Sequence, residues 1–476
     1  MHITASLRFV YRLLALLMLM TVWACGTPTG WMGLGGEEES PAAKAAAAAQ
    51  EKPAEKQPPK PAAPATPAPA SSSTPPATPA PAQGNQGNNG FAPPSHINNE
   101  PPPPAPVGVY ALPTNLGEGA LKNVPTVKVA LLVPLTGASA DVGKSFLDAG
   151  VLALYDKYNA LSTHETTAKV ELLPKDTGDT IEGAEKAAQD AIQEGATLIL
   201  GPVYSKQVSV VASSARHQNI PVITFSNNMA VAGEGVYLFG FVPEQQVVRI
   251  VQYSLGHNIT NIAALVPSDP YGAAIVKQLS QEMRKHNGRI YPVEYYSEDM
   301  QALDNNVGRL SRFIQDEGTK NQALFIAEGG KKLKTLTDTL VANGISANNV
   351  QMLGTGLWDD PELLKWPNVN GGWFASSPPE KYTAFEQHFM TTYSYRPERR
   401  SSLAYDATAL AVNLALSSSG KGFPTEKILD PVGFNGPANG IFRFHDDGSV
   451  ERGLAVLMVT PAGFKTIDPA PTMFNQ

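Results

Sequence analysis

The sequence predicts an α/β protein of two doubly wound lobes, each built on a mostly parallel sheet, after a long Pro- and Ala-rich segment. Three observations predict this fold. From Thr126 onward, apolar β-rich runs alternate with helical stretches of about 10–15 residues, the pattern of βαβ units. The alternation breaks near Phe241, and the strands are too numerous for one open sheet. With one cysteine in the chain, stability must come from packed cores.

The first lobe is predicted from residues 126–241 and about 375–434. Its strands are short apolar runs, and its helices repeat apolar residues near one face, as Phe146, Ala149 and Leu152 do. The predicted elements are strands Val127–Leu135, Lys169–Leu173, Thr197–Val203 and Pro221–Ser226, and helices Lys144–Tyr158, Glu182–Glu194 and Lys206–Gln218.

The second lobe is predicted from residues 242–374 and about 440–460, where the same rhythm starts again. The predicted elements are strands Ile262–Pro267, Ile290–Tyr296, Ala323–Ala327 and Val350–Leu353, and helices Glu244–Leu255, Tyr271–His286, Asp304–Glu317 and Lys331–Asn343.

Residues 26–125 predict a disordered linker. Phe91 is the only aromatic residue between Trp31 and Tyr110, and 21 of the chain's 41 prolines lie between Pro41 and Pro125. Such a segment buries too little apolar surface to offset the entropy of ordering it. We expect a passive spacer that holds the folded part away from a membrane.

Residues 1–25 predict a lipoprotein signal. Arg8 and Arg12 supply positive charge before an apolar stretch, residues 13–22, that is too short for a comfortable membrane span. The stretch ends just before Cys25, the only cysteine, which we expect to carry the lipid. The alternative, which Trp23 leaves open, is an ordinary secretory signal. We expect a periplasmic protein attached to a membrane through this lipid, the outer membrane if the cell is Gram-negative.

Catalytic motifs are weak. Residues 138–145 fit a relaxed phosphate-loop pattern that would place Lys144 on phosphate and Ser145 on magnesium, but Ala138 stands where the stricter pattern has glycine. The histidines have no metal-ligand spacing, and no Gly-x-Ser-x-Gly turn is present. The net charge of -7 and the absence of a long basic cluster argue against nucleic acid. We therefore expect no enzyme, no cofactor and no metal.

Small polar residues follow four of the predicted strands. In open α/β sheets ligands bind outside the carboxyl ends of the strands, so we expect these residues to line a ligand site. Turn and helix-cap roles are the alternative for each one. The candidates are Thr136, Gly137, Ser139, Ser205, Ser226, Asn227, Asn228 and Tyr271.

Four segments carry a family resemblance. Residues 132–143, 200–207, 220–228 and 266–272 resemble, in this order, the type I periplasmic-binding family typified by the Leu/Ile/Val-binding proteins. The resemblance covers about residues 126–460 and implies a two-lobed flytrap fold with crossovers near Phe241, Ala375 and residues 434–440.

The same resemblance implies roles for individual residues. Ser205 and the segment Ser226–Asn228 stand where family members hold a ligand carboxylate, and Tyr271 stands where an aromatic side chain covers the ligand. Gly356 stands where an acidic residue pairs with the ligand ammonium, so Glu328 or Asp359 would have to replace it.

A second branch of this superfamily is similar in the segment Phe225–Gln246 and in its lipid signal and linker: the lipoproteins named penicillin-binding protein activators. We therefore expect a non-catalytic envelope lipoprotein that regulates cell-wall synthesis, with a peptidoglycan synthase as partner. The alternative is a receptor that delivers an amino acid or another small polar ligand to the permease of an ABC importer.

Overall fold

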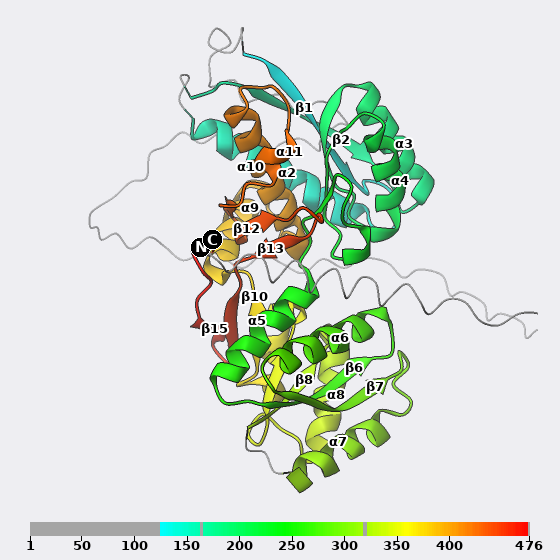
Figure 1. Ribbon diagram of the computed structural model, residues 1–476, viewed down its shortest axis with the longest axis vertical. Coiled ribbons are helices and arrows are strands. Elements are labelled where there is room, and N and C mark those ends of the chain that lie inside the picture. The colour runs from blue at the N-terminus through cyan, green and yellow to red at the C-terminus, as the bar shows by residue number, and fades with distance from the viewer. Residues whose placement is uncertain (1–123, 162–164, 318–320, 475–476) are drawn as a thin grey trace, which may run out of the picture. The chain divides into compact units, whose positions relative to one another are not determined.

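The computed structural model describes residues 124–161, 165–317 and 321–474. The predicted signal, Cys25 and the linker up to residue 123 lie outside these residues. The described chain forms two lobes, each around its own sheet, with helices on both faces (Figure 1). The predicted two-lobed α/β fold is confirmed.

The first lobe is built on a five-stranded parallel sheet in the order β2-β1-β3-β4-β5. Because β1 lies between β2 and β3, the chain winds outward in both directions from it, which is the doubly wound arrangement. The strands are β1 (Thr126–Val133), β2 (Lys169–Asp176), β3 (Ala196–Leu200), β4 (Val222–Thr224) and β5 (Val236–Leu238).

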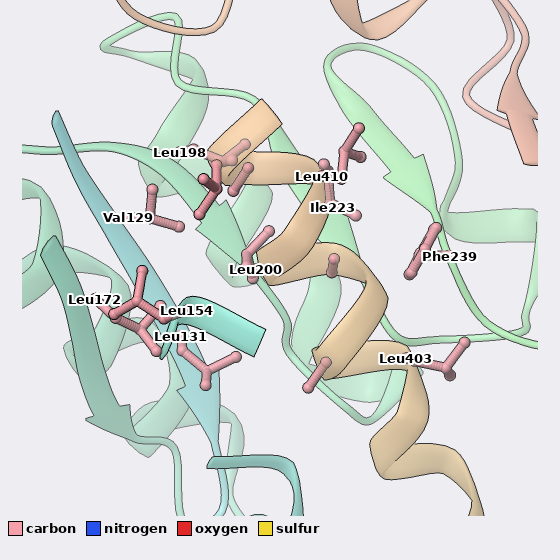
Figure 2. Close-up of a cluster of buried hydrophobic side chains, with 14 of the residues drawn as sticks. Val129, Leu131, Leu154, Leu172, Leu198, Leu200, Ile223, Phe239, Leu403 and Leu410 are labelled. Atoms are coloured by element: carbon pink, nitrogen blue, oxygen red, sulfur yellow. The ribbon is translucent and has the colours of Figure 1, made fainter. Parts of the chain in front are cut away.

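Successive residues of β1 serve opposite faces of this sheet, as the strand period requires. Val129 and Leu131 belong to a core shared with α2 and α10, whereas Ala130 and Leu132 belong to a core shared with α3 and α4. Figure 2 shows the first core, with Leu403 and Leu410 of α10 over the strands. The covering helices are α2 (Ala140–Asn159), α3 (Ile181–Gln193), α4 (Ser205–Arg216) and α10 (Ser402–Ser417).

The second lobe is built on a seven-stranded sheet in the order β15-β14-β10-β9-β8-β6-β7. The five strands β10, β9, β8, β6 and β7 are parallel to one another. β14 and β15 pair antiparallel at one edge of this sheet. The strands are β6 (Asn261–Pro267), β7 (Arg289–Tyr296), β8 (Gln322–Ile326), β9 (Gln351–Gly354), β10 (Trp373–Ser376), β14 (Ala455–Thr460) and β15 (Gly463–Asp468). The helices are α5 (Pro243–Gly256), α6 (Pro270–Lys285), α7 (Leu303–Glu317) and α8 (Gly330–Ala342). None of the described helices combines the length and apolar character needed to cross a bilayer.

The chain passes between the two lobes after β5, after β10 and between β13 and β14. A small antiparallel sheet, β11-β12-β13, packs on the first lobe, where Phe442 lies 4.7 Å from Phe239 between ring centroids. The remaining elements are α9 (Pro379–Tyr393), α11 (Thr425–Ile428), β11 (Phe434–Gly436), β12 (Gly440–Phe444) and β13 (Val450–Arg452). Short 3-10 turns are η3 (Met229–Val231), η4 (Gly356–Trp358), η5 (Pro361–Lys365), η6 (Pro367–Val369) and η7 (Arg399–Ser401).

In each lobe a glycine brings the helix that follows the first strand, α2 or α6, close to the end of that strand. A Cβ atom at Gly143 of α2 would lie 1.8 Å from the carbonyl oxygen of Pro134, and one at Gly272 of α6 would lie 1.9 Å from that of Pro267. No side chain fits at such distances, so glycine is required at both places. The two turns that carry Thr136–Ser139 and Tyr271 are therefore held tightly against their sheets.

Candidate functional site

The loop after β1 is held by two aspartates at the end of β2: Asp176, its last residue, and Asp179, which follows it. Asp176 accepts hydrogen bonds from the Leu135 and Thr136 backbone N–H groups at 2.8 and 3.2 Å, and from the Thr136 hydroxyl at 2.6 Å. Asp179 accepts from the Ala138 N–H at 2.6 Å and from the Ser139 hydroxyl. Thr136 and Ser139 are thus bound to their own protein, and each hydroxyl keeps a lone pair for a ligand.

These contacts favour the charged form of both aspartates. Burial by itself raises the pKa of Asp176, but hydrogen bonds from Thr136, Gly178 and Leu135 outweigh it and lower the pKa. Hydrogen bonds from Ser139 and Ala138 lower the pKa of the exposed Asp179. The loop is therefore fixed by carboxylates that stay ionised at neutral pH. Between these anchors Gly137 has φ +86, and a Cβ there would meet the Asp179 carboxylate at 2.2 Å.

Helix α4 begins beside this loop with an open N-terminus. Its N-cap, Tyr204, makes no side-chain cap hydrogen bond, and within the described residues the Ser205 hydroxyl has no partner. Lys206 donates to the carbonyl oxygen of Asp179 at 2.8 Å and so joins α4 to the loops after β1 and β2. The free N–H groups of the first turn and the Ser205 hydroxyl are donors suited to a carboxylate.

The segment after β4 lies next to the α4 turn. The Thr224 hydroxyl donates to the Pro202 carbonyl oxygen at 2.9 Å. Ser226 is buried and its hydroxyl accepts the Asn228 N–H at 3.1 Å, while the Asn228 side chain accepts from Ala230. Asn227 is exposed, and no partner for its side chain occurs in the described residues. The structure thus brings the first-lobe candidates to one edge of the sheet. The side chains of Ser226 and Asn228 already accept hydrogen bonds from backbone N–H groups there.

In the second lobe Tyr271 lies at the start of α6, after the N-cap Asp269, whose carboxylate accepts the Gly272 N–H at 2.8 Å. The hydroxyls of Tyr271 and Thr355 share a hydrogen bond of 3.1 Å. Burial raises the pKa of Tyr271, and the negative charges of Glu328 and Asp269 raise it further. The tyrosine is held neutral in a negative environment.

Glu328 follows β8 and supplies much of this negative charge. The Tyr296 hydroxyl donates to Glu328 Oε2 at 2.6 Å, and the Gly329 N–H donates to Oε1 at 3.0 Å. Glu244, at the start of α5, also acts on Tyr271, and its Oε2 is shielded from solvent with no hydrogen-bond partner among the described residues. The second-lobe group therefore presents carboxylates, which attract a cationic ligand group.

Gly356 contacts the side chain of Gln246. Its N–H donates to Gln246 Oε1 at 2.8 Å, and a Cβ there would lie 2.7 Å from Gln246 Nε2. The side chain of Gln246 fills the space that an acidic residue at position 356 would need.

Asp359, the other expected substitute, is bound within the protein. It accepts from Arg399 Nη2 at 2.9 Å and from the Ser376 hydroxyl at 2.7 Å. The Arg399 guanidinium also lies 3.8 Å from the centre of the Tyr382 ring. Of the two carboxylates, Glu328 lies in the Tyr271 group and Asp359 is the counter-ion of Arg399.

The residues of the phosphate-loop pattern also contact the protein itself. Lys144 forms an ion pair with Asp148 at 2.5 Å, and the Ser145 hydroxyl accepts the Glu398 N–H at 2.9 Å. Among the residues that the structure describes, no three His, Cys, Asp or Glu side chains gather as a metal site.

Sequence reasoning did not select several residues that organise the site. Asp176, Asp179, Glu244 and Tyr296 were not candidates. Yet Asp176 is the last residue of the observed β2, and Tyr296 is the last residue of both the predicted strand and β7. The rule that selected Thr136 and Ser205, polar residues at strand carboxyl ends, would have found Asp176 and Tyr296 but not Glu244, which lies at a helix start. Arg399 has no such pattern, because its partner Asp359 lies 40 residues earlier.

Two doubly wound lobes joined by three crossovers, with polar groups at the carboxyl ends of both sheets, define a two-lobed binding protein. The chain belongs to the periplasmic binding protein family, whose model matches residues 126–464. This confirms the family resemblance and places the chain in a family of binding proteins. An uncharacterized protein of Rickettsia prowazekii is 27% identical over 227 residues, which are 46% of this chain and 57% of that protein.

Solved structures share the fold. A protein described as a branched-chain amino acid ABC transporter, from Rhodospirillum rubrum, has a TM-score of 0.64 at 18% identity, covering 72% of this chain and 100% of its own. A branched-chain amino acid binding protein from Streptococcus pneumoniae, in complex with isoleucine, has a TM-score of 0.52 at 18% identity, with coverages of 72% and 100%. A solute binding protein from Rhodopseudomonas palustris, in complex with benzoate, has a TM-score of 0.53 at 15% identity, with coverages of 74% and 98%. At these identities the likeness concerns the fold.

Proposed function

We propose that the protein is a non-catalytic solute receptor that delivers a small polar ligand, an amino acid or a related carboxylate, to an ABC importer. The observation that carries this proposal is the opposite chemistry of the two lobes. The first lobe offers hydrogen-bond donors at α4 and Ser205, whereas the second offers the Glu328 carboxylate beside Tyr271. A ligand with a carboxylate at one end and an ammonium at the other complements both groups.

Glu328 is the specific support for an amino acid. A buried ammonium without a counter-charge is costly, and by the family resemblance that counter-charge would stand at position 356, which is glycine in this chain. Glu328 is placed by two hydrogen bonds and acts on the same tyrosine that would cover the ligand. The amino acid and benzoate complexes among the related structures support carboxylates as the ligand class.

The test is calorimetric titration of the whole protein with a panel of L-amino acids and simple carboxylates. We expect one class to bind, and Ser205→Ala to weaken it about tenfold through loss of a hydrogen bond to a charged group. Ser209→Ala, an exposed serine one turn further along α4, is the matched control and should leave binding unchanged. Loss of binding in Glu328→Gln identifies an ammonium ligand, whereas binding that survives it identifies a simple acid.

A second candidate function is regulation of peptidoglycan synthesis. It rests on the likeness of the segment Phe225–Gln246 to penicillin-binding protein activators, and residues 227–230 of this segment are exposed, including Met229 at 39%. A protein partner would reach this surface directly. Capture of a purified peptidoglycan synthase by the protein, abolished by Met229→Asp and accompanied by no ligand in the panel, would replace the receptor proposal with this one.

The receptor proposal includes a location. We propose that Cys25 carries a lipid and that residues 26–125 form a spacer between the membrane and the two lobes. We also propose that the residue ranges of the lobes are close to those predicted from the sequence. Mass spectrometry of the mature protein tests this, because acylation adds the mass of the acyl chains to the N-terminal peptide. An unmodified Cys25 in that peptide would contradict it.

A further inference from the structure

A cavity of ≈ 440 Å³ opens in the first lobe between α2, α10, the start of α9 and β11. Its apolar wall is Ala153, Ala409 and Pro437, and its polar wall is Asp156, Lys157, Lys381, Tyr405 and Asn435. None of these residues belongs to the strand-end groups described above. The volume lies in the range of sites for small molecules.

The lining carboxylate of this cavity, Asp156, already has hydrogen-bond partners in the protein. Asp156 accepts the Tyr405 hydroxyl at 2.6 Å, and it pairs with His388 Nε2 at 3.0 Å. Both of its oxygen atoms therefore have protein donors on one side of the cavity. Asp156 holds Tyr405 and His388 in place on that side. The other polar side chains of the lining, Lys157, Lys381 and Asn435, have nitrogen donors.

Lys157 is the least satisfied of those donors. It lies on α2, half-buried, and makes no hydrogen bond or ion pair with the described residues. Burial lowers the pKa of Lys157, although the charge of the nearby Asp406 acts in the opposite direction. An ammonium in this position gains from any anion that enters the cavity.

Lys381 and Asn435 form the second donor group. Lys381 Nζ donates to Asn435 Oδ1 at 2.9 Å and to the Gly436 carbonyl oxygen at 3.2 Å. This orients Asn435 with its oxygen toward the lysine, and its NH₂ group has no partner among the described residues. The cavity thus holds two lysine ammonium groups and one amide NH₂ beside one lining carboxylate, Asp156, which is hydrogen-bonded to Tyr405 and His388.

We propose that this cavity is a second ligand site, which binds a small organic oxyanion, a carboxylate or a phosphate, on Lys157 and the Lys381–Asn435 pair. The ligand's carbon atoms lie on Ala153, Ala409 and Pro437. The site is independent of the receptor site, because it uses other elements of the first lobe and none of the second.

The first test measures lysine reactivity in the whole protein. Lys157 is acetylated with an amine-reactive ester and quantified by mass spectrometry in chloride, then with propionate or inorganic phosphate at equal ionic strength. Because only the free site reacts, we expect Lys157 labelling to slow about tenfold when the anion is at roughly ten times its dissociation constant. Lys186, exposed on α3 and paired with Asp190, is the internal control and should label at a constant rate. Protection by propionate alone or by phosphate alone identifies which oxyanion the site takes.

The second test measures affinity by calorimetry with the same two anions. Lys157→Gln and Lys381→Gln should each weaken binding at least about tenfold, because each removes a charge-assisted hydrogen bond. Lys186→Gln, at an exposed lysine of α3, should leave the affinity unchanged. Constant labelling of Lys157 with both anions would overturn the proposal, as would unchanged affinity in Lys157→Gln. Should Lys157→Gln not fold, the protection experiment on the unmodified chain still decides.

Discussion

Arg399 donates from Nη2 to Asp359 Oδ2 at 2.9 Å, and this ion pair joins the loop after β9 in the second lobe to the start of α10 in the first. The same guanidinium lies over the Tyr382 ring and donates from Nη1 to Asn439 and Ser402. The two side chains are 24% and 15% exposed. Arg399 therefore contacts both lobes, and all of these contacts are made by its planar guanidinium group.

Arg399→Met leaves Asp359 partly buried without its counter-charge. We expect the free energy of unfolding to fall by about 2–3 kcal/mol, measured by urea denaturation, and Arg399→Lys to fall between this variant and the unmodified protein, since lysine keeps the charge but not the paired geometry. Lys186→Ala, which breaks the exposed pair with Asp190, should change stability by less than about 0.5 kcal/mol. Equal effects of Arg399→Met and Lys186→Ala would contradict the assignment.

Replacing the close-packed glycines tests the turns that carry the site. Gly143→Ala and Gly272→Ala place a methyl group within 1.9 Å of a backbone carbonyl oxygen, so we expect each to lower the unfolding free energy by about 1–3 kcal/mol or more. Gly256→Ala, at the end of α5 with no atom within 4 Å, is the matched control and should be neutral or stabilising. Thermal denaturation of the three variants measures the difference, and a stable Gly272→Ala would show that α6 is free to move.

Asp406 makes stability depend on pH. Burial raises its pKa to about 6, against the hydrogen bonds from Ala438 and Asn439, whereas the ordinary value is 3.8. Because the folded state binds this proton more tightly than the unfolded state, the contribution is complete below the ordinary value. It is lost as the pH rises through about 6, a difference of about 3 kcal/mol.

Asp406→Asn removes this titration. Its unfolding free energy should vary less between about pH 4 and pH 7 than that of the unmodified protein, although the variant loses a hydrogen bond at all pH values. Urea denaturation across this pH range provides the measurement, with Asp190→Asn, whose side chain is 42% exposed, as control. Parallel pH profiles for Asp406→Asn and the unmodified protein would refute the role of this carboxyl group.

Tyr296 positions Glu328 for a ligand ammonium. Tyr296→Phe removes the 2.6 Å hydrogen bond, so we expect amino acid affinity to fall about three- to tenfold, with no change for ligands that lack an ammonium group. Tyr295→Phe, the exposed neighbour on β7, is the control. Calorimetry with the ligand from the panel measures both, and an equal loss for the two ligand types would mean that Tyr296 acts on folding alone.

Sequence periodicity located the regular elements well where apolar residues repeat. The strand predicted at Val127–Leu135 is observed at Thr126–Val133, but the helix predicted from Lys144 begins at Ala140. The first turn of that helix has no apolar repeat, since the buried face starts only near Phe146. No element was predicted after Gly354, where the chain forms the helices α9 and α10 as well as short 3-10 turns and strands.

The site was predictable only as far as single segments reveal it. Strand-end position selected Thr136, Ser205 and Tyr271, and whether they bind a ligand stays a prediction. What the sequence does not reveal is pairing at long range: Asp176 reaches Thr136 from 40 residues away, and Gln246 reaches Gly356 from 110. Such partners depend on topology, which local patterns do not specify.

The interlaced path of the chain has a consequence for how the molecule is made. Helix α10 closes one face of the β1–β5 sheet, yet it is synthesised only after all of β6–β10. A ribosome-bound or truncated product that stops before Ser402 leaves the part of this apolar face that α10 covers exposed to solvent, which favours aggregation. Neither half can therefore be excised as one uninterrupted piece, and any rearrangement of the gene that keeps a working product must keep both halves together.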